Sequence, residues 1–387
     1  MPEINLLIPG PTPLPPEVLH AMGQQMTNHR GPTFGRLMGE VLTGLQEVFQ
    51  TRHDVIPLVA SGTGGLEAAV TNFLSPGDRV LSVNNGHFCE RFAAIAEKFG
   101  VRVDRVTAEW GRPVPLEAIA ERVKAHGPEY KAVFVTQSET STGVHNDVRA
   151  VREVLGDHPA LLMVDAVSSL GAIPLETDAW GVDVAVTGSQ KALMSPPGMA
   201  FLSVSDRAWD AAERATLPRF YFDLRKVRAE IHKPIPSTPF TAAVSVVYAV
   251  HAALRLIRRE GLPQVFARHR RIARMVRAGV RALGLSTLPE DAWAVDTVTA
   301  VRMPDGIDAK AVAERVREGY GVIVATGIGP LEHTVIRIGH LGYTSAESLL
   351  TGLEALGRVL SDMGHPADTA AAITVAQRTF NGTPHPV

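Results

Sequence analysis

The chain has 387 residues, of which 45% are apolar and 20% charged, with 38 basic and 40 acidic residues. These values exclude an intrinsically disordered chain, which would have few apolar residues and a large net charge. The balanced charge provides no broad basic field, so we expect no nucleic-acid partner, and the length favours two α/β domains.

The first 16 residues contain six prolines, including the turn Pro9-Gly10-Pro11. Such a segment is too broken for a helix and too apolar for a free tail, so we expect an N-terminal arm that docks on the rest of the chain. Between residues 17 and 50 the apolar spacing predicts two helices, separated by a loop at residues 28–32.

From residue 56 onward, short β-rich runs alternate with helical patterns, which is typical of parallel strands joined by crossover helices. The predicted strands are residues 56–59, 79–83, 132–135, 161–164, 182–187 and 199–204, and the predicted helices are residues 65–74, 88–99, 115–126 and 147–155. The pattern predicts a large, doubly wound, mostly parallel sheet.

A helical pattern from residue 242 to 260 stops at Gly261-Leu262-Pro263 and restarts through residue 283, which indicates a domain boundary near 261. Strands at 297–301 and 335–338 with helices at 308–319 and 345–360 then predict a smaller α/β domain. We therefore divide the chain into an arm (1–16), a large domain (17–260), a small C-terminal domain (261–364) and a tail (365–387). The tail is polar and alanine-rich, and we expect it to be partly disordered.

Polar groups follow several of the predicted strands: Ser61-Gly62-Thr63-Gly64-Gly65, residues 137–143, Asp165 and Ser189-Gln190-Lys191. Parallel sheets place ligands at the carboxyl ends of their strands, so one cleft can collect these groups. A lysine amine in a partly dry pocket condenses with an aldehyde, and a nearby aspartate keeps a pyridinium nitrogen protonated. The glycine-rich segment, leading into a helix, presents free N–H groups to a phosphate.

Each piece also has an ordinary structural interpretation. Lys191 alone resembles a solvated surface residue, and Asp165 alone could cap a helix. The glycines could serve merely to permit a tight turn, and they do not form the GxGxxG pattern of a dinucleotide-binding loop. The conjunction of the three pieces favours the functional interpretation.

Cys89 is the only cysteine, so the chain forms no internal disulfide and no multi-cysteine metal site. The histidines show no ligand spacing, and we predict no metal. No apolar run reaches about 18 residues, and the N-terminus lacks a signal-peptide pattern. We expect a cytoplasmic protein without membrane contact.

The chain resembles the class V, fold-type I aminotransferases up to about residue 362, in particular the alanine–glyoxylate and serine–pyruvate branch. The resemblance depends on the order and separation of several segments. These are Pro9-Gly10-Pro11, Ser61 to Gly65, Ser138-Glu139-Thr140-Ser141-Thr142-Gly143, Asp165-Ala166-Val167-Ser168-Ser169, Gly188 to Leu193, Pro196-Pro197-Gly198 and Arg337-Ile338-Gly339. It implies pyridoxal 5′-phosphate as the cofactor.

The resemblance assigns the following roles. Lys191 binds the cofactor covalently and then transfers protons, and Asp165 pairs with the pyridine nitrogen. Thr63, Gly64, Gly65 and Gln190 hold the phosphate, and Ser141 or Thr142 lies near the ring hydroxyl. Phe88 stacks on one ring face and Val167 covers the other. Members of the family often carry Trp at the position of Phe88, so His87 remains a competing stacking residue and Phe88 could be an ordinary core residue.

Two further assignments come from the same resemblance. Thr238 and Thr241 match a segment that reaches the cofactor phosphate of a partner subunit, which implies a homodimer with shared sites, although such Ser/Thr/Pro clusters are mostly turns. Arg337 interrupts an apolar strand pattern, and its fork suits the α-carboxylate of an amino acid, whereas a solvent-facing edge position is the alternative.

The favoured function is transfer of an amino group from a small amino acid, alanine or serine, to a small 2-oxo acid, glyoxylate or pyruvate. A phosphonate-type transaminase differs only in its side-chain pocket. A cysteine desulfurase would need a thiol on a mobile loop, which Cys89 does not match. A non-catalytic subunit with the same fold and a dinucleotide-dependent dehydrogenase are the remaining alternatives.

Overall fold

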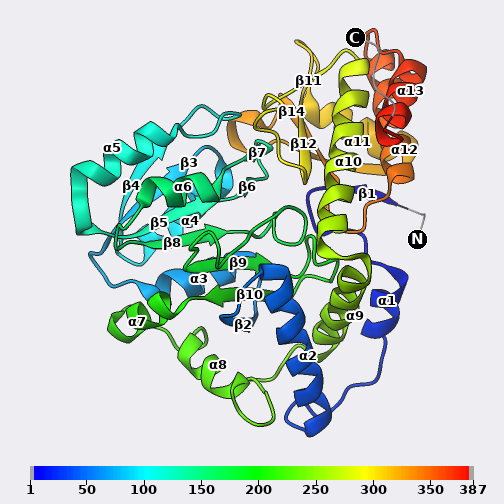
Figure 1. Cartoon of the computed structure of the whole chain (residues 1–387). Helices are drawn as coiled ribbons and strands as arrows, with labels where there is room; N and C mark the ends of the chain where they lie inside the picture. Colours follow the sequence, from blue (N-terminus) through cyan, green and yellow to red (C-terminus); the bar gives the residue numbers. More distant parts are fainter. Residues whose placement is uncertain (1–3, 383–387) are drawn as a thin grey trace.

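The computed structural model describes residues 4–382, and its central feature is a seven-stranded sheet. The strand order is β2 (Asp54–Val59), β10 (Met199–Val204), β9 (Val184–Gly188), β8 (Leu161–Asp165), β5 (Tyr130–Thr136), β3 (Arg79–Asn84) and β4 (Arg102–Thr107) (Figure 1). All adjacent pairs are parallel except those of β10, which runs antiparallel to β2 and β9. The connection from β9 to β10 is residues 189–198, too short for the helical crossover that a parallel pair needs.

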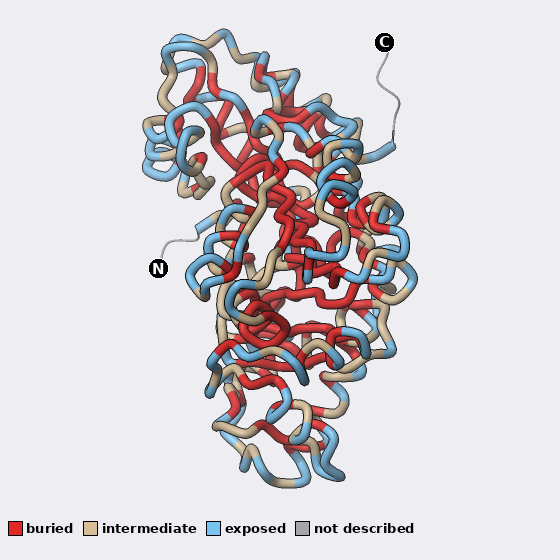
Figure 2. The backbone as a smooth tube through the Cα atoms, turned by 90° about the vertical axis from the view of Figure 1, so that its left-hand side faces the viewer, coloured by how far each residue is buried: buried red, intermediate tan, exposed pale blue. Residues whose placement is uncertain are grey.

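Helices cover both faces of this sheet. One apolar cluster includes residues of α3 (Gly62–Phe73), α4 (His87–Lys98), α7 (Asp206–Arg214) and α8 (Leu224–Ile231), and another includes residues of α2 (Pro32–Phe49), α5 (Leu116–His126), α6 (Val148–Leu155) and α9 (Val244–Glu260). Every residue of β8 and β9 is consequently buried, as in sheets covered on both sides. Figure 2 shows the buried parts of the backbone, in red, running through the middle of the molecule, with exposed parts around them.

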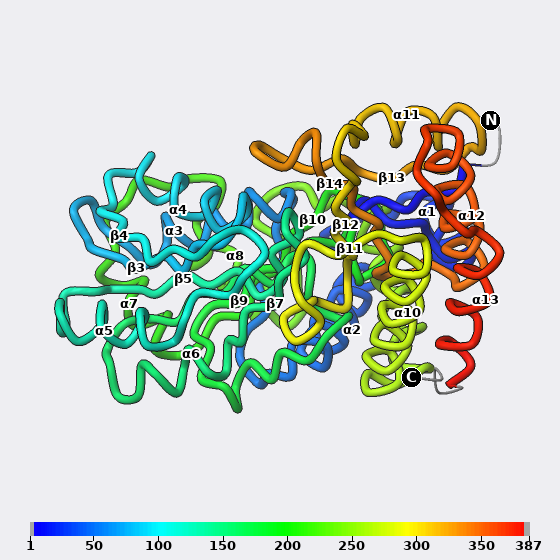
Figure 3. Tube along the Cα trace, turned by 90° about the horizontal axis from the view of Figure 1, so that it is seen from above, coloured from blue at the N-terminus to red at the C-terminus, as the bar shows by residue number. Residues whose placement is uncertain are grey.

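A second sheet has the order β1 (Asn5–Leu7), β13 (Val322–Thr326), β14 (Val335–Gly339), β12 (Val298–Arg302) and β11 (Ser286–Thr287). Its apolar cluster includes residues of α10 (Leu262–Ala282), α11 (Ala309–Tyr320) and α12 (Ala346–Asp362). Strand β1 pairs in parallel with β13, so the N-terminal segment lies among the elements of the C-terminal part of the chain (Figure 3). Helix α1 (Pro16–Met22) follows it and packs near α9.

The C-terminal segment differs from the expectation of partial disorder over residues 365–387. Residues Thr369–Phe380 form helix α13, which Asp368 caps by accepting a hydrogen bond from the backbone N–H of Ala371 at 2.9 Å. Ala372 and Ala376 are fully buried. The helix packs closely against α10 because Gly279 leaves room: a Cβ added there would lie 3.3 Å from the Cβ of Ala376. Residues 383–387 of the expected tail lie outside the described residues.

The alternating pattern located most elements but missed β4 at the edge of the large sheet. Four of its six residues are charged or polar, because an edge strand needs apolar residues on one face at most. Its Arg105 pairs with Glu90 and Glu97 of α4, both at 2.6 Å. Helices α7 and α8 and strand β13 were also not anticipated.

No helix among residues 4–382 has the length and apolar character needed to cross a membrane. Within the same residues, the structure holds no group of three or more His, Cys, Asp or Glu side chains arranged to bind a metal ion.

Candidate active site

The polar segments that follow β2, β5, β8 and β9 lie at one edge of the large sheet, where the parallel strands end. Asp165 is the last residue of β8, Lys191 lies three residues after β9, and Ser61 caps α3 two residues after β2. Parallel strands bring these positions together because their carboxyl ends face the same direction.

Lys191 is enclosed by the N-terminal segment. Its Nζ donates a hydrogen bond to the carbonyl of Pro9, and a Cβ added to Gly10 would lie 2.7–2.8 Å from the end of its side chain. Thr12 fixes the same contact, because its N–H donates to the carbonyl of Gln190 at 3.2 Å and its hydroxyl to that of Lys191 at 3.1 Å. Burial, followed by the nearby Arg337 guanidinium, lowers the pKa of Lys191 to about 8.

Asp165 is 5% exposed and accepts a hydrogen bond from the N–H of Val167 at 2.9 Å. Burial raises its pKa to about 6, with a smaller contribution in the same direction from Glu139, while the Val167 N–H and Lys191 act in the opposite direction. The carboxylate therefore lacks a full charge partner among the described residues and would gain from a cation placed beside it. Val167 itself packs over the start of α3, where a Cβ on Gly62 would meet its side chain at 2.6 Å.

The first turn of α3 contains Thr63, Gly64 and Gly65. Ser61 caps the helix, its hydroxyl accepting from the N–H of Gly64 at 3.4 Å. Gly65 permits packing of α3 on β9, since a Cβ there would lie 2.7 Å from the Cγ1 of Val186. Beside this turn, a Cβ on Gly188 would lie 2.8 Å from the Oε1 of Gln190, and this buried oxygen has no hydrogen-bond partner in the described part of the chain.

Ser141 and Thr142 are completely buried in the loop after β5. The Ser141 hydroxyl donates to Glu139 at 2.6 Å and accepts from the N–H of His87 at 3.0 Å. The Thr142 hydroxyl lies 3.4 Å from the carbonyl of Glu139. The Ser141 hydroxyl is thus already engaged within the protein, whereas the Thr142 hydroxyl makes only this one long hydrogen bond in the described part of the chain.

Glu139 organises this loop, and sequence reasoning gave it no role. It is fully buried, and its carboxylate accepts hydrogen bonds from the backbone N–H groups of Phe88, Cys89 and Ser141 at 2.9–3.1 Å. Two of these donors belong to the first turn of α4, whose positive end favours a carboxylate. The available signal was an acid between hydroxyl-bearing residues, directly after a buried strand.

Cys89 donates its thiol hydrogen to Glu139 with a distance of 3.0 Å, and burial raises its pKa. It is 2% exposed on the first turn of α4. A buried, protonated thiol on a helix lacks the properties of a loop nucleophile.

Phe88 and His87 are both half-buried at the start of α4, with ring centroids 5.4 Å apart in an edge-to-face arrangement. Burial, followed by Arg91, lowers the pKa of His87, so this ring is neutral near pH 7. Both rings belong to the helix that Glu139 holds, and the geometry does not select one of them as the stacking residue.

Arg337 lies on β14, an inner strand of the second sheet, and is 8% exposed. The alternative of a solvent-facing arginine on an edge strand is therefore wrong. The Nε of Arg337 donates to the carbonyl of Thr326 at 2.9 Å and its Nη1 to that of Thr140 at 3.3 Å. Burial lowers its pKa to about 10, so it remains charged near neutral pH. With two carbonyl partners and no carboxylate within 4.0 Å among residues 4–382, Arg337 can bind an anion.

Thr238 and Thr241 lie on the segment before α9. The Thr238 hydroxyl donates to the carbonyl of Phe240 at 2.7 Å, and Thr241 is exposed. Both line a small groove with Tyr221 and Phe240, and within the described chain no hydrogen bond connects them to Lys191, Asp165 or Arg337.

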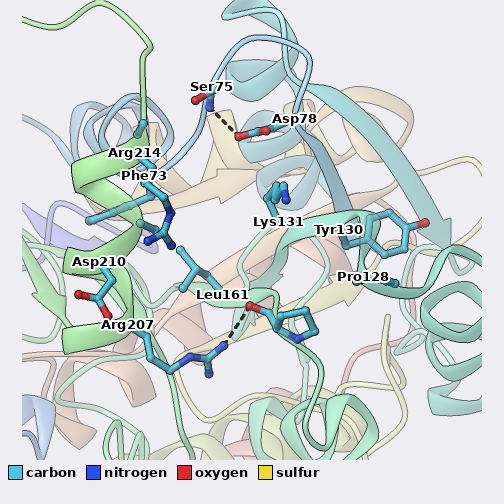
Figure 4. Close-up of a pocket in the computed structure, with 13 residues that line it drawn as sticks. Phe73, Ser75, Asp78, Pro128, Tyr130, Lys131, Leu161, Arg207, Asp210 and Arg214 are labelled. Carbon is cyan, nitrogen blue, oxygen red and sulfur yellow. Dashed lines mark hydrogen bonds between the residues drawn. The ribbon is translucent and has the colours of Figure 1, made fainter.

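A cavity of about 550 Å³ lies at the opposite edge of the large sheet, near the amino ends of β3, β5 and β8 (Figure 4). Lys131, Arg207 and Arg214 line it together with Asp78 and Asp210. None of the predicted site residues lines this cavity. The cavity is therefore a different place from the cluster of polar groups at the carboxyl ends of the strands.

The family described as Aminotransferase class-V matches residues 4–346. The chain is 41% identical to the soluble hydrogenase 42 kDa subunit of Anabaena cylindrica, over 98% of this chain and 99% of the relative. It is 40% identical to the L-aspartate–glyoxylate aminotransferase of Paracoccus denitrificans, over 98% and 96%. The solved structure of an alanine–glyoxylate aminotransferase from Nostoc sp. has a TM-score of 0.89 and 34% identity, covering 93% of this chain and 96% of that one.

Proposed function

Because the chain belongs to the class V aminotransferase family and has its fold-type I architecture, we propose that it is a pyridoxal phosphate-dependent transaminase of small substrates. The amino donor would be alanine or serine and the acceptor glyoxylate or pyruvate, in two successive half-reactions. The relatives with glyoxylate in their names support this choice of acceptor.

The residues at the strand ends fit the proposed cofactor. Asp165 is a buried carboxylate without a full charge partner, which a protonated pyridine nitrogen would supply. The first turn of α3 and the unpartnered Gln190 offer polar groups to the phosphate. When bound, pyridoxal phosphate supplies an aldehyde that exchanges amino groups and a ring that accepts electrons from the substrate Cα.

Lys191 would hold the cofactor through Nζ and, once displaced by the substrate amine, take the proton from the substrate Cα. A pKa of about 8 suits both tasks, because a useful fraction of the amine is uncharged near neutral pH while the protonated form can still donate. Gly10 and Pro9 enclose this amine and keep water from its surroundings.

Arg337 would bind the substrate α-carboxylate in both half-reactions. Its guanidinium is held by the carbonyls of Thr326 and Thr140, which fix the plane of the fork without neutralising its charge. The Thr140 carbonyl comes from the loop that Glu139 organises, so the two sheets jointly orient this side chain.

A homodimer with shared sites forms part of the proposal. The segment containing Thr238 and Thr241 adjoins exposed aromatic residues, of which Phe220 is 73% and Tyr221 42% exposed. Tyr221 stacks on Phe240 with ring centroids 4.8 Å apart, so the segment presents an ordered apolar surface to a second copy. In the dimer, the two threonine hydroxyls would reach the phosphate of the partner's site.

The single observation that carries the proposal is the placement of Lys191 and Asp165 at adjacent strand ends near Arg337, which has no carboxylate partner among residues 4–382. The test incubates the purified protein with pyridoxal phosphate, a panel of amino donors and either glyoxylate or pyruvate, and measures the amino acids formed. We expect glycine from glyoxylate or alanine from pyruvate, and no product from Lys191→Ala. Absence of product from every donor, or full activity of Lys191→Ala, would contradict the proposal. Turnover only of aminophosphonates would establish the phosphonate-type alternative.

A further inference from the structure

Arg91 is a half-buried cation on α4 that has no role in the site described so far. It lies one turn after His87 and Phe88 on the same face of the helix. Its Nη1 donates to the hydroxyl of Thr63 at 3.3 Å, and its Nη2 lies 3.2 Å from the Nε2 of His87. The guanidinium carbon is 4.8 Å from the centre of the Phe88 ring. These contacts direct the guanidinium toward the start of α3.

All three neighbours of this guanidinium are uncharged. Thr63 offers a hydroxyl group and Phe88 a hydrocarbon ring. The lowered pKa of His87 keeps its imidazole neutral. Within residues 4–382, no carboxylate lies within 4.0 Å of Arg91, whereas Arg105, on the next strand β4, pairs with both Glu90 and Glu97. The uncharged contacts replace part of the hydration that the partly buried guanidinium loses but do not neutralise its charge, so its surroundings favour binding an anionic group.

The start of α3 adds further donors at the same place. Gly64 and Gly65 direct their N–H groups to Ser61, and among residues 4–382 the N–H groups of Gly62 and Thr63 have no hydrogen-bond partner. A helix N-terminus with free N–H groups favours a negatively charged ligand. The Thr63 hydroxyl, which contacts Arg91, lies in this turn, so the guanidinium and the helix end flank one space.

Arg91 also faces the catalytic groups. Burial dominates the pKa shifts of Lys191 and Asp165, but the Arg91 charge contributes to both. Arg337 already serves the substrate carboxylate in the proposed function, so a second cation beside the α3 terminus is available for a different anion.

We propose that Arg91 binds the phosphate monoester of the cofactor, together with the first turn of α3. The assignment rests on the proposed use of pyridoxal phosphate and adds a charged ligand to the hydroxyl and backbone donors. A guanidinium fork matches two phosphate oxygens, and the backbone N–H groups and the Thr63 hydroxyl can bind others. The phosphate would also supply the negative charge that the neutral neighbours of Arg91 do not.

The test compares two ligands that differ only in the phosphate. The full-length protein, freed of cofactor, is titrated with pyridoxal phosphate and with pyridoxal, and the dissociation constants follow from absorbance. For Arg91→Gln we expect roughly ten- to a hundredfold weaker binding of pyridoxal phosphate, the loss of one charge-assisted hydrogen bond. Pyridoxal affinity should stay within about twofold. Arg91→Lys should retain part of the preference for pyridoxal phosphate over pyridoxal, because a lysine keeps the charge but not the fork.

The matched control is Lys98→Gln, which removes one positive charge at the exposed far end of the same helix and should change neither constant. Retained pyridoxal binding by Arg91→Gln shows that the variant is folded. Equal losses for both ligands, or no loss for either, would overturn the assignment. So would unchanged cofactor affinity with a selective loss of turnover for aspartate relative to alanine, since Arg91 would then bind a second substrate carboxylate.

The outcome is separable from that of the proposed function. The wild-type protein could transaminate no donor and still bind pyridoxal phosphate more tightly than pyridoxal. In that case the proposed reaction is wrong, and the titration of the Arg91 variants alone decides whether Arg91 binds the phosphate.

Discussion

Gly10 lies so close to Lys191 that a Cβ added to it would be 2.8 Å from the lysine Nζ, although the two residues are far apart in sequence. Gly10 also has a backbone φ of +130°, which side-chain-bearing residues rarely adopt. The glycine is therefore required both by its own backbone and by the space that the lysine occupies.

Gly10→Ala should consequently displace the Lys191 amine. We expect roughly a hundredfold loss of transaminase activity, the scale at which a displacement of about 1 Å affects a catalytic group. The control is Gly77→Ala, where φ is +82° but a Cβ would meet nothing within 4 Å. This control should lose only about 1–2 kcal/mol of stability and keep its activity. Equal activities of the two variants would show that the contact at Lys191 is unimportant.

Lys191 should make the stability of the cofactor-free protein depend on pH. Its folded pKa of about 8 is below its ordinary value of 10.5, so between these pH values the unfolded chain binds more protons than the folded one. The free energy of unfolding contributed by this residue must therefore rise as the pH increases from about 8 to 10.5. Relative to Lys191→Met, the wild type should gain stability over that window in urea titrations. Parallel pH profiles for the two proteins would contradict the lowered pKa.

Asp165→Asn should preserve the shape of the site and slow the removal of the Cα proton. A neutral amide cannot favour a protonated pyridine as a carboxylate does, and we expect a loss of roughly 10²–10⁴-fold in the single-turnover rate. The measurement is stopped-flow absorbance with saturating cofactor and alanine. An unchanged rate would remove Asp165 from the chemistry and leave it as a buried structural acid.

Arg337→Lys should raise the apparent KM for donor and acceptor alike, because an ammonium group supplies a point charge without the planar fork. We expect kcat/KM to fall roughly ten- to a hundredfold, as for one lost charge-assisted hydrogen bond. The absorbance of the bound cofactor should stay unchanged. If cofactor retention suffered while substrate affinity did not, Arg337 would have to be reassigned to the structure.

The holoenzyme should sediment as a dimer or a larger assembly. Phe220→Glu should shift the distribution toward monomers, because it places a charge on the exposed aromatic surface beside Thr238 and Thr241. Tyr320→Glu is the matched control, since Tyr320 is 41% exposed on α11, away from that surface. A stable and fully active monomer would rule out the shared site.

Local sequence patterns predicted much of this architecture. The apolar runs that became β8, β9 and β10 bury every residue, and such runs bounded by turn residues identify strands without knowledge of their neighbours. Strand β4 and helix α13 were missed for different reasons. The strand carries four charged or polar side chains at a sheet edge, and the helix has an alanine-rich sequence whose buried Ala372 and Ala376 pack in the same apolar cluster as residues of α10 and α12.

The order of Ser61, Asp165 and Lys191 at the ends of β2, β8 and β9 was sufficient to predict the chemistry proposed for the site, because parallel strands bring their carboxyl ends to one edge. Only the tertiary structure decided which groups surround that chemistry. Gly10 meets Lys191, Glu139 holds the start of α4, and Thr140 orients Arg337, each through contacts between segments remote in sequence. The spacing of side chains along a helix or strand encodes which residues share a face. Contacts between remote segments depend on how the two sheets and the N-terminal segment pack together, and no local pattern specifies that packing.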